Sequence, residues 1–236
     1  MRALALVLAA WWLVSRATSE FVLPTPGGVA DRAWSERDAL LDQVSVTFGR
    51  VAAAYALACV AGVALGTLIG RVDVVRRALR PVVSFLFPTP KVALYPAMLI
   101  VLGLGAASKI GLGFAEALFP ILLATAAGTS RVDPRLLWTG RTLKVRAPLL
   151  RIVVPAALPS ILTGARIGLV GAIVGVFLAE MIAGADGLGH QMAISYRTLD
   201  TPEMYVAIIA VSLVGYALDR AFLLARRRAL AWSVEG

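Results

Sequence analysis

The feature that most constrains this chain is a series of long apolar runs with hardly any charge. Twenty uncharged residues separate Arg50 from Arg71, and Glu116 is the only charge between Lys109 and Arg131. A helix needs about twenty mostly apolar residues to cross the hydrocarbon core of a bilayer. With 59% hydrophobic residues in a chain of 236, the composition also exceeds the apolar share of soluble domains. The sequence therefore predicts an all-α polytopic membrane protein.

The apolar runs predict six transmembrane helices in a single domain that covers residues 1–236. The first run is short and follows Arg2, so it could instead be a cleaved signal peptide. Glycines recur at every fourth position in two of the runs, a spacing that lets helices approach closely in lipid. The predicted spans are 3–16, 46–70, 82–102, 109–129, 158–180 and 204–224. The recurring glycines are Gly62, Gly66 and Gly70, then Gly164 and Gly168, and Gly171 and Gly175.

The cations are unevenly distributed over the predicted loops. Fifteen lysines and arginines lie in the N-terminal, 71–80, 131–151 and 219–236 segments, and six lie in the segments on the other side. Because cytoplasmic loops carry the excess of Lys and Arg, both termini and the 131–151 loop are predicted to be cytoplasmic. Residues 23–43 would then lie outside, as a turn followed by an amphipathic helix at the surface. This distribution assigns the net charge of +9 to membrane topology, and no nucleic-acid partner is predicted.

Several classes of function are disfavoured by motifs that the sequence lacks. None of the three lysines lies in a G-x-x-x-x-G-K-[ST] phosphate-binding loop, so the chain is not expected to hydrolyse ATP itself. No G-x-S-x-G motif occurs, and a single histidine argues against a hydrolase triad. One cysteine and one histidine also make a metal or haem site unexpected. We therefore predict a conduit or scaffold that is not an enzyme and binds no cofactor directly.

Three ionisable residues within the predicted spans are candidates for a translocation pathway or its gate: Lys91, Glu116 and Glu180. A charge inside the bilayer is unfavourable, so it usually has a partner or marks a solute pathway. Lys91 follows Arg80 by eleven residues, near mid-bilayer if helical, and either meets an anionic solute or pairs with Glu116 or Glu180. Glu180 is expected near the outer mouth. Arg166 is expected to extend to lipid headgroups or carbonyl oxygens.

The segment between the fourth and fifth predicted spans, residues 131–155, mixes cations with apolar side chains. It is longer than a simple connection requires. It could form short helices that present a face to a partner protein, or a basic loop that fixes topology and touches lipid headgroups. The apolar side chains among its cations are Leu136, Leu137, Trp138, Leu143 and Val145.

A set of further motifs occurs in a fixed order along the chain: FVLPTPGGV, FPTPKVALYPAMLIVLGLGAASKIGLGFAEALFPILLATAAG, VDPRLLWTGRTL, PAALPSILTGARIG and AEMIAGADGLG. Together they resemble the permease subunits of bacterial ABC importers, in the nitrate/sulfonate/taurine/bicarbonate-type branch, over about residues 20–225. The resemblance implies a type I permease bundle in the bacterial inner membrane. It implies a second permease copy, identical or not, and a cytoplasmic subunit that uses ATP. It also implies an extracytoplasmic binding protein that delivers a small anionic or polar organic solute, such as nitrate, a sulfonate or taurine.

In the resembled family, the loop between the fourth and fifth spans carries a Glu-Ala-Ala…Gly motif and forms the helix that couples to the ATPase. The resemblance assigns residues 131–155 to this loop. The family's Glu falls on Trp138 and its later Gly on Lys144. This difference leaves three alternatives: the partner ATPase has co-adapted, a second non-identical permease is present, or coupling is weak. The residues implied for coupling are Leu137, Trp138, Thr139, Gly140, Arg141, Leu143 and Lys144.

Two other classes of function remain open from the sequence. A secondary transporter driven by an ion gradient would show broken helices in two corresponding halves, with acidic ion sites. A membrane scaffold that transports nothing would be favoured if the altered coupling motif could not dock an ATPase.

Overall fold

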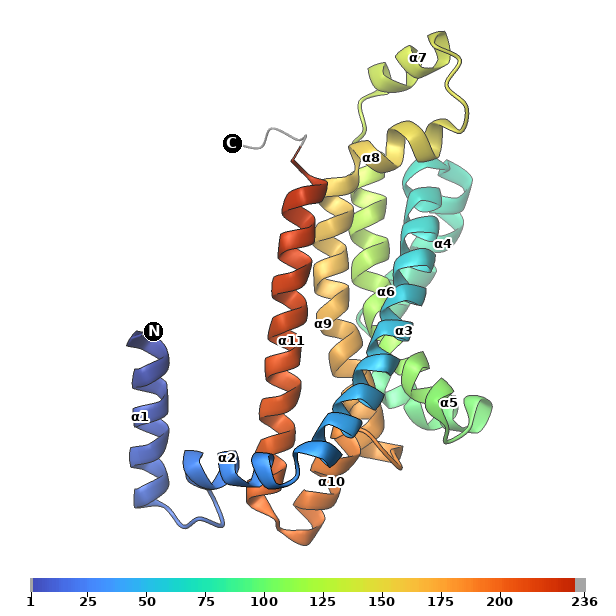
Figure 1. Cartoon of the computed structure of the whole chain (residues 1–236). Coiled ribbons are helices and arrows are strands. Elements are labelled where there is room, and N and C mark those ends of the chain that lie inside the picture. Colours follow the sequence, from blue (N-terminus) through green and yellow to red (C-terminus); the bar gives the residue numbers. More distant parts are fainter. Residues whose placement is uncertain (1, 232–236) are drawn as a thin grey trace.

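The computed structural model describes residues 2–231, with side chains from residue 6, and every regular element in this range is helical. Residues 1 and 232–236 of the predicted 1–236 domain lie outside the described part. The elements, shown in Figure 1, are α1 (Arg2–Ala17), α2 (Pro26–Ser35), α3 (Arg37–Arg71), α4 (Asp73–Leu86), η1 (Lys91–Leu94), α5 (Tyr95–Leu102), α6 (Ala106–Ser130), α7 (Pro134–Thr142), η2 (Leu149–Val153), α8 (Val154–Ala156), α9 (Leu158–Ala183), α10 (Leu188–Thr198) and α11 (Thr201–Ala229).

Within residues 2–231, four helices are long and apolar enough to cross a membrane: α3, α6, α9 and α11. The predicted spans 46–70, 109–129, 158–180 and 204–224 each lie within one of them. The all-α prediction is therefore confirmed, and each of these four predicted spans falls on a helix that is long and apolar enough to cross. The predicted count of six transmembrane helices is not fully confirmed, because α1 is short and the remaining candidate is bent.

The predicted third span, residues 82–102, is not one straight helix. Helix α4 ends at Leu86, and after Pro88 and Pro90 the chain continues as η1 and α5 at 90° to α4. Proline lacks a backbone N–H and disfavours helical geometry at the preceding residue, so two prolines separated by one residue interrupt the helix. Counted as one bent span, this pair brings the number of crossings to five.

The start of α4 also differs from its predicted place in a loop. Residues 73–80 are helical, and none of the α4 residues is buried. Arg76, Arg77 and Arg80 are exposed or partly exposed, and Arg76 pairs with Asp73 at 2.6 Å. An amphipathic helix of this kind can lie at the membrane surface, with its cations at the headgroups. The cations counted for residues 71–80 therefore belong mainly to a helix.

Helix α6 forms the centre of the bundle, between α3 and α9, and glycines bring these helices together. A Cβ on Gly66 of α3 would overlap with the carbonyl oxygen of Leu122, and one on Gly175 of α9 would overlap with Gly113. Lipid offers little hydrophobic driving force between helices, so close backbone packing supplies much of their association. The structure therefore confirms the predicted role of the glycine spacing.

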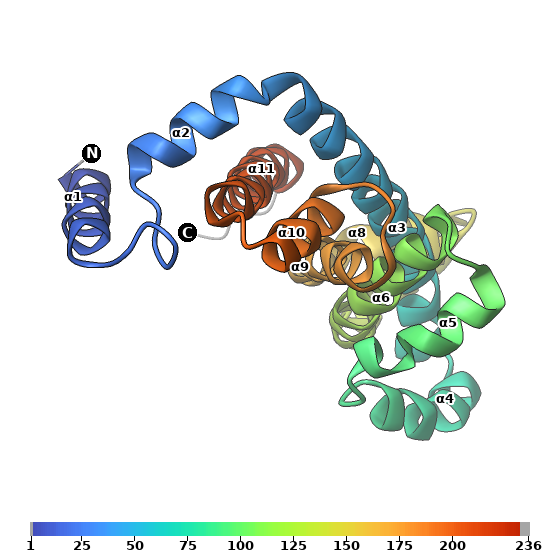
Figure 2. The same cartoon turned by 90° about the horizontal axis from the view of Figure 1, so that it is seen from below.

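The two ends of the bundle carry different elements. Helices α7 and α8 and the end of α11 lie at one end, and α2 and α10 lie at the other (Figure 1). Helix α2 confirms the predicted helix in residues 23–43; it is capped by Thr25, with Pro26 at its first position. Viewed along the bundle, α2 and α3 curve around α11, and α1 stands apart (Figure 2). The Trp11 ring of α1 stacks on Tyr205 at 6.3 Å.

Candidate functional site

The segment between α6 and α9 projects beyond the end of the bundle and carries helix α7 (Figure 1). The side chain of Asp133 accepts a hydrogen bond from the backbone N–H of Arg135 at 2.8 Å, and Pro134 occupies the first helical position. Both features are favoured at helix starts, since the first N–H groups have no partner within the helix. The local sequence thus defines where α7 begins.

The inner side of α7 packs against the chain that returns to α9. Leu137 contacts a buried cluster that includes Val132 and Val153. Gly140 is also buried, and a Cβ there would overlap with the side chain of Ile152. Residues three apart share one face of a helix, so these two positions hold α7 against η2. Of the predicted coupling residues, Leu137 and Gly140 therefore face inward.

The outer side of α7 and the turn after it expose large apolar side chains between cations. Trp138 and Leu143 are each 70% exposed. Thr139 and Arg141 are exposed as well, and the Thr139 hydroxyl donates to the carbonyl oxygen of Arg135 at 3.0 Å. Aromatic and arginine side chains gathered on an exposed face are typical of protein interfaces. These residues form what we call the α7 outer face: Trp138, Thr139, Arg141 and Leu143.

Lys144, which ends the predicted coupling set, has a left-handed backbone with φ of 51°. Glycine is the residue that adopts this conformation without a steric penalty, and the resembled family has its motif glycine at this position. The backbone here retains the geometry that favours glycine, although the side chain is a lysine. Ala147 follows with φ of 55°, so the return from α7 contains two left-handed residues.

The structure brings together two of the three predicted pathway residues. Lys91 begins η1 at the bend, and its Nζ lies 3.4 Å from Oε2 of Glu116 on α6. Their side chains are 12% and 25% exposed, and Nζ also lies 5.3 Å from the ring centroid of Phe119. The ion-pair interpretation of Lys91 is therefore confirmed, and a role for this pair in a solute pathway stays a prediction.

Glu180 lies in a different cluster and has no exposed surface. Its carboxylate accepts hydrogen bonds from Arg50 Nη1 at 2.7 Å, from the Thr47 hydroxyl at 2.8 Å and from the Gly189 N–H at 3.2 Å. Sequence reasoning missed Arg50 and Thr47 because it treated Arg50 as the boundary of an apolar run. A detectable signal was present: Arg50 and Glu180 both lie at the predicted outer end, Arg50 in the second span and Glu180 in the fifth.

Arg166 also differs from its predicted contact with headgroups or carbonyl oxygens. Its Nε and Nη2 donate to the two carboxylate oxygens of Asp219 on α11, at 2.7 and 3.0 Å. A guanidinium fits a carboxylate in this two-bond geometry, so an acid at the same depth of a neighbouring helix is the better partner. The pair joins α9 to α11 near the end that carries the loop.

These features define a class: a polytopic α-helical membrane protein with a capped helix projecting from one end and charge pairs between its spans. Residues 60–230 match the family described as the binding-protein-dependent transport system inner membrane component, and the chain belongs to this family. It is an ABC transporter permease of the nitrate/taurine-type branch, with the type I permease fold.

Relatives from three organisms illustrate this membership. The chain is 31% identical to a probable ABC transporter permease of Brucella melitensis, over 95% of this chain and 93% of that protein. It is 30% identical to the taurine transport system permease of Escherichia coli strain K12, over 98% and 88%. It is 34% identical to the nitrate import permease of a Synechocystis species, over 75% and 66%.

Proposed function

We propose that this chain is the permease subunit of an ATP-driven importer in a bacterial inner membrane. It forms the translocation pathway with a second permease copy, identical or not, and a separate cytoplasmic subunit binds and hydrolyses the ATP. That subunit docks on residues 131–155, and the observation that carries this proposal is the α7 outer face, with its exposed Trp138 and Leu143. Both termini lie in the cytoplasm with this loop.

The packing of α7 supports a mechanical role for the loop. Leu137 and Gly140 hold α7 against η2, and η2 leads through α8 directly into α9. A partner that moves α7 therefore also moves the start of a central spanning helix. Such a partner shifts the bundle between two states only if it binds them with different affinity, and an exposed apolar face offers that binding energy.

The solute is proposed to be small and anionic or polar, and to be delivered by an extracytoplasmic binding protein. Two relatives are permeases named for taurine and nitrate, which supports this class. Lys91 and Glu116 are the pathway residues, since the pair sits at the bend between α4 and α5 and keeps some exposure. Glu180 is buried, so we assign it to the outer gate.

The coupling role is tested by purifying the chain together with its ATP-binding subunit. Trp138→Ala, or Arg141→Glu combined with Lys144→Glu, should abolish solute-dependent ATP hydrolysis and co-purification while the spans stay folded. The matched control is Arg227→Glu with Arg228→Glu, which makes the same charge change on exposed residues at the same end. Normal hydrolysis and transport by the loop variants would refute this assignment.

An ion-gradient mechanism has less support from the structure. It would be expected to use two broken helices in corresponding halves. Among the described residues, one helix pair is sharply bent at a short break, namely α4 with η1 and α5.

A further inference from the structure

The turn between α9 and α10, residues 184–187, is held by side chains at the end of the bundle opposite the loop. The first N–H groups of a helix have no partner within it, and here side chains of α3 and α9 bind them. The bonds are Gly187 N–H to Gln43 Oε1 at 2.5 Å, Leu188 N–H to the Thr47 hydroxyl at 2.8 Å, and Gly189 N–H to Glu180 Oε2 at 3.2 Å. An anionic carboxylate at this position also suits the positive end of the helix dipole.

The glycines of this turn are required by the buried carboxylate. Gly187 has φ of 94°, and a Cβ there would overlap with the carboxyl group of Glu180. A Cβ on Gly189 would overlap with the backbone of Phe177 and the side chain of Glu180. The chain therefore wraps closely around one carboxylate, and the seating of the turn depends on that group.

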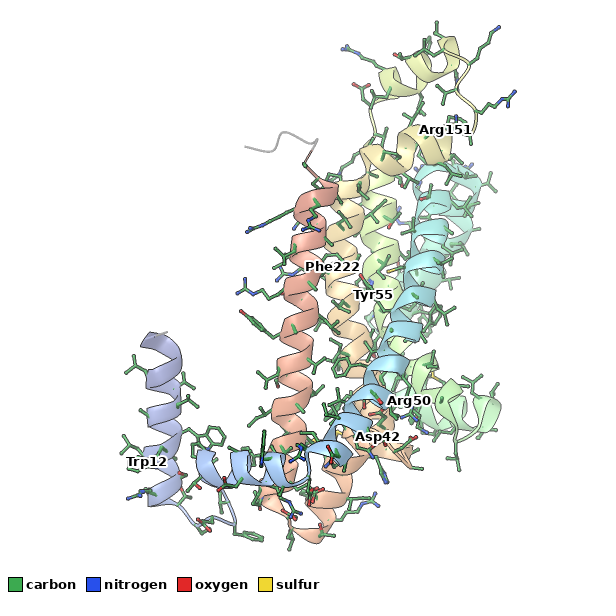
Figure 3. All side chains as sticks on the ribbon, in the orientation of Figure 1. Trp12, Asp42, Arg50, Tyr55, Arg151 and Phe222 are labelled. Carbon is green, nitrogen blue, oxygen red and sulfur yellow. The ribbon has the colours of Figure 1, made fainter. Side chains whose placement is uncertain are left out.

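Arg50 bridges two carboxylates that differ strongly in burial. Its Nη1 bonds Glu180, whose side chain is fully buried, and its Nη2 bonds Oδ1 of Asp186 at 2.5 Å, where the Asp186 side chain is 47% exposed. Nη1 also donates to the backbone carbonyl oxygen of Asp186 at the longer distance of 3.3 Å. Figure 3 shows Arg50 on the lower part of α3, at the end away from Arg151. Breaking a buried pair leaves an uncompensated charge, whereas an exposed ion pair contributes little. The two ion pairs of Arg50 are therefore unequal.

We propose that Arg50 is a positioning residue for the outer turn, with a permanent bond to Glu180 and a releasable bond to Asp186. When Asp186 is bonded, residues 184–187 stay seated on α3. When it is released, water solvates the free carboxylate and residues 184–186 can move, because the remaining bond of Arg50 to the Asp186 carbonyl oxygen is longer, at 3.3 Å. Gln43, Thr47 and Glu180 keep the start of α10 capped. The consequence for transport rests on the proposed function, in which this turn is part of the outer gate.

The structural part is tested on the full chain in lipid nanodiscs with a single spin label on the turn. The chain has one cysteine, so Cys59→Ala with Ala185→Cys gives a unique site at an exposed position. Asp186→Asn should raise the mobile fraction of the label about fivefold, a size typical of a weak, partly exposed pair. Asp186→Glu should restore most of the seated signal, because it keeps the charge.

The control is Asp42→Asn, which removes a carboxylate from an exposed position on the same stretch of α3. It should leave the label unchanged. An Asp186→Asn spectrum like that of Asp42→Asn would overturn the proposal, and so would an Asp186→Glu spectrum as mobile as that of Asp186→Asn.

Thermal unfolding separates the permanent bond from the releasable one. Glu180→Gln should lower Tm by about 10 °C, because breaking a buried pair is strongly destabilising. Asp186→Asn should lower it by about 2–4 °C at most, as expected for a partly exposed pair that contributes little. A loss of Tm in Asp186→Asn as large as in Glu180→Gln would overturn the releasable role, because Asp186 would then be a structural residue.

The transport consequence is measured on the chain purified with its ATP-binding subunit. Asp186→Asn should raise the rate of ATP hydrolysis in the absence of the binding protein about fivefold. This factor matches the shift in turn population, because the variant populates the released turn without needing the binding protein. An unchanged basal rate would overturn the gating role. If the unmodified complex shows no hydrolysis that depends on the binding protein, the proposed function fails and the label result still decides the structural part.

Discussion

Lys144 shows how one residue can carry the geometry of a motif that its side chain has lost. Its φ of 51° lies in the region where a Cβ clashes with the neighbouring carbonyl oxygen. The N–H of Lys144 bonds the Arg141 carbonyl oxygen at 3.0 Å, and the N–H of Val145 bonds the Gly140 carbonyl oxygen at 2.9 Å. These bonds close the end of α7 and hold the unfavourable backbone in place.

We predict that Lys144→Gly stabilises the return from α7. Removing the Cβ relieves the left-handed strain, and after the added backbone entropy of glycine about 0.5–1 kcal/mol should remain. Limited proteolysis of the loop should therefore slow by about two- to fivefold. Arg146→Gly is the control, because Arg146 has no positive φ and should gain nothing. Faster cleavage of Lys144→Gly than of the control would contradict the prediction.

The sequence offered Glu116 and Glu180 as alternative partners for Lys91, of which the structure shows Glu116, and it did not indicate the Arg50–Glu180 pair. Both outcomes have one physical reason. Lys91 and Glu116 interrupt apolar runs. Because a charge in lipid is unfavourable, both were predicted to have a partner or to mark a solute pathway. Arg50 ends an apolar run, where an arginine is usually solvated by water and headgroups. Which boundary charge turns inward depends on helix rotation and on the course of the 184–187 turn, and neither can be read from hydropathy.

At the scale of elements, glycines set how closely the three central helices approach. Gly62, Gly66 and Gly70 of α3 all face α6, and their contacts include backbone atoms of that helix. The recurrence of glycine at every fourth position was visible in the sequence and correctly predicted close packing of these helices. Pro88 and Pro90 likewise indicated an irregular backbone around Lys91, and the structure confirms a break there. The 90° angle between α4 and the η1–α5 segment could not be predicted, since apolar content does not register a missing backbone donor.

We predict opposite effects for the same substitution at two glycines of α3. Gly66→Ala should destabilise the fold by about 1–3 kcal/mol, because the added Cβ meets backbone that cannot rotate away. Gly49→Ala has no heavy atom within 4 Å of the added Cβ, so it should be neutral or stabilise the helix by up to about 1 kcal/mol. Chemical unfolding in mild detergent measures both. Equal effects at the two sites would show that α3 and α6 are not in this contact.

The Arg166–Asp219 pair links two elements, and its geometry predicts a charge-swap result. Arg166→Asp places two acids together between α9 and α11 and should lower Tm and loosen α11. Adding Asp219→Arg restores an opposite pair and should recover much of the loss, although the two-bond fit of the native orientation will not be fully reproduced. If the double variant is no better than the single one, the two side chains do not act as a pair.

At the scale of the whole molecule, the two ends of the bundle are held differently. At the end with α2 and α10, Arg32 bonds Asp200 and Glu203 at 2.8 and 3.0 Å, and Arg50 joins α3 to the α9–α10 turn. Toward the other end, α9 and α11 share the Arg166–Asp219 pair. Along the middle of the bundle, α11 flanks two apolar grooves of about 400 and 370 Å³, one shared mainly with α9 and the other mainly with α3. Tyr55 and Phe222, labelled in Figure 3, line the smaller groove. Among the described residues, the end with α2 and α10 thus carries more of the ion pairs that join separate elements than the end with the loop does.

The orientation of the whole molecule gives the last prediction. The loop with α7 and the turn at residue 185 lie at opposite ends of the bundle (Figure 1), and the excess of cations assigns the loop to the cytoplasm. In the Cys59→Ala background, Ala185→Cys should react with a membrane-impermeant maleimide in cells whose outer membrane is permeabilised and whose inner membrane is intact. Arg141→Cys should react only after the inner membrane is permeabilised. Labelling of residue 141 from outside would reverse the topology and leave the α7 outer face beyond the reach of any ATP-hydrolysing subunit.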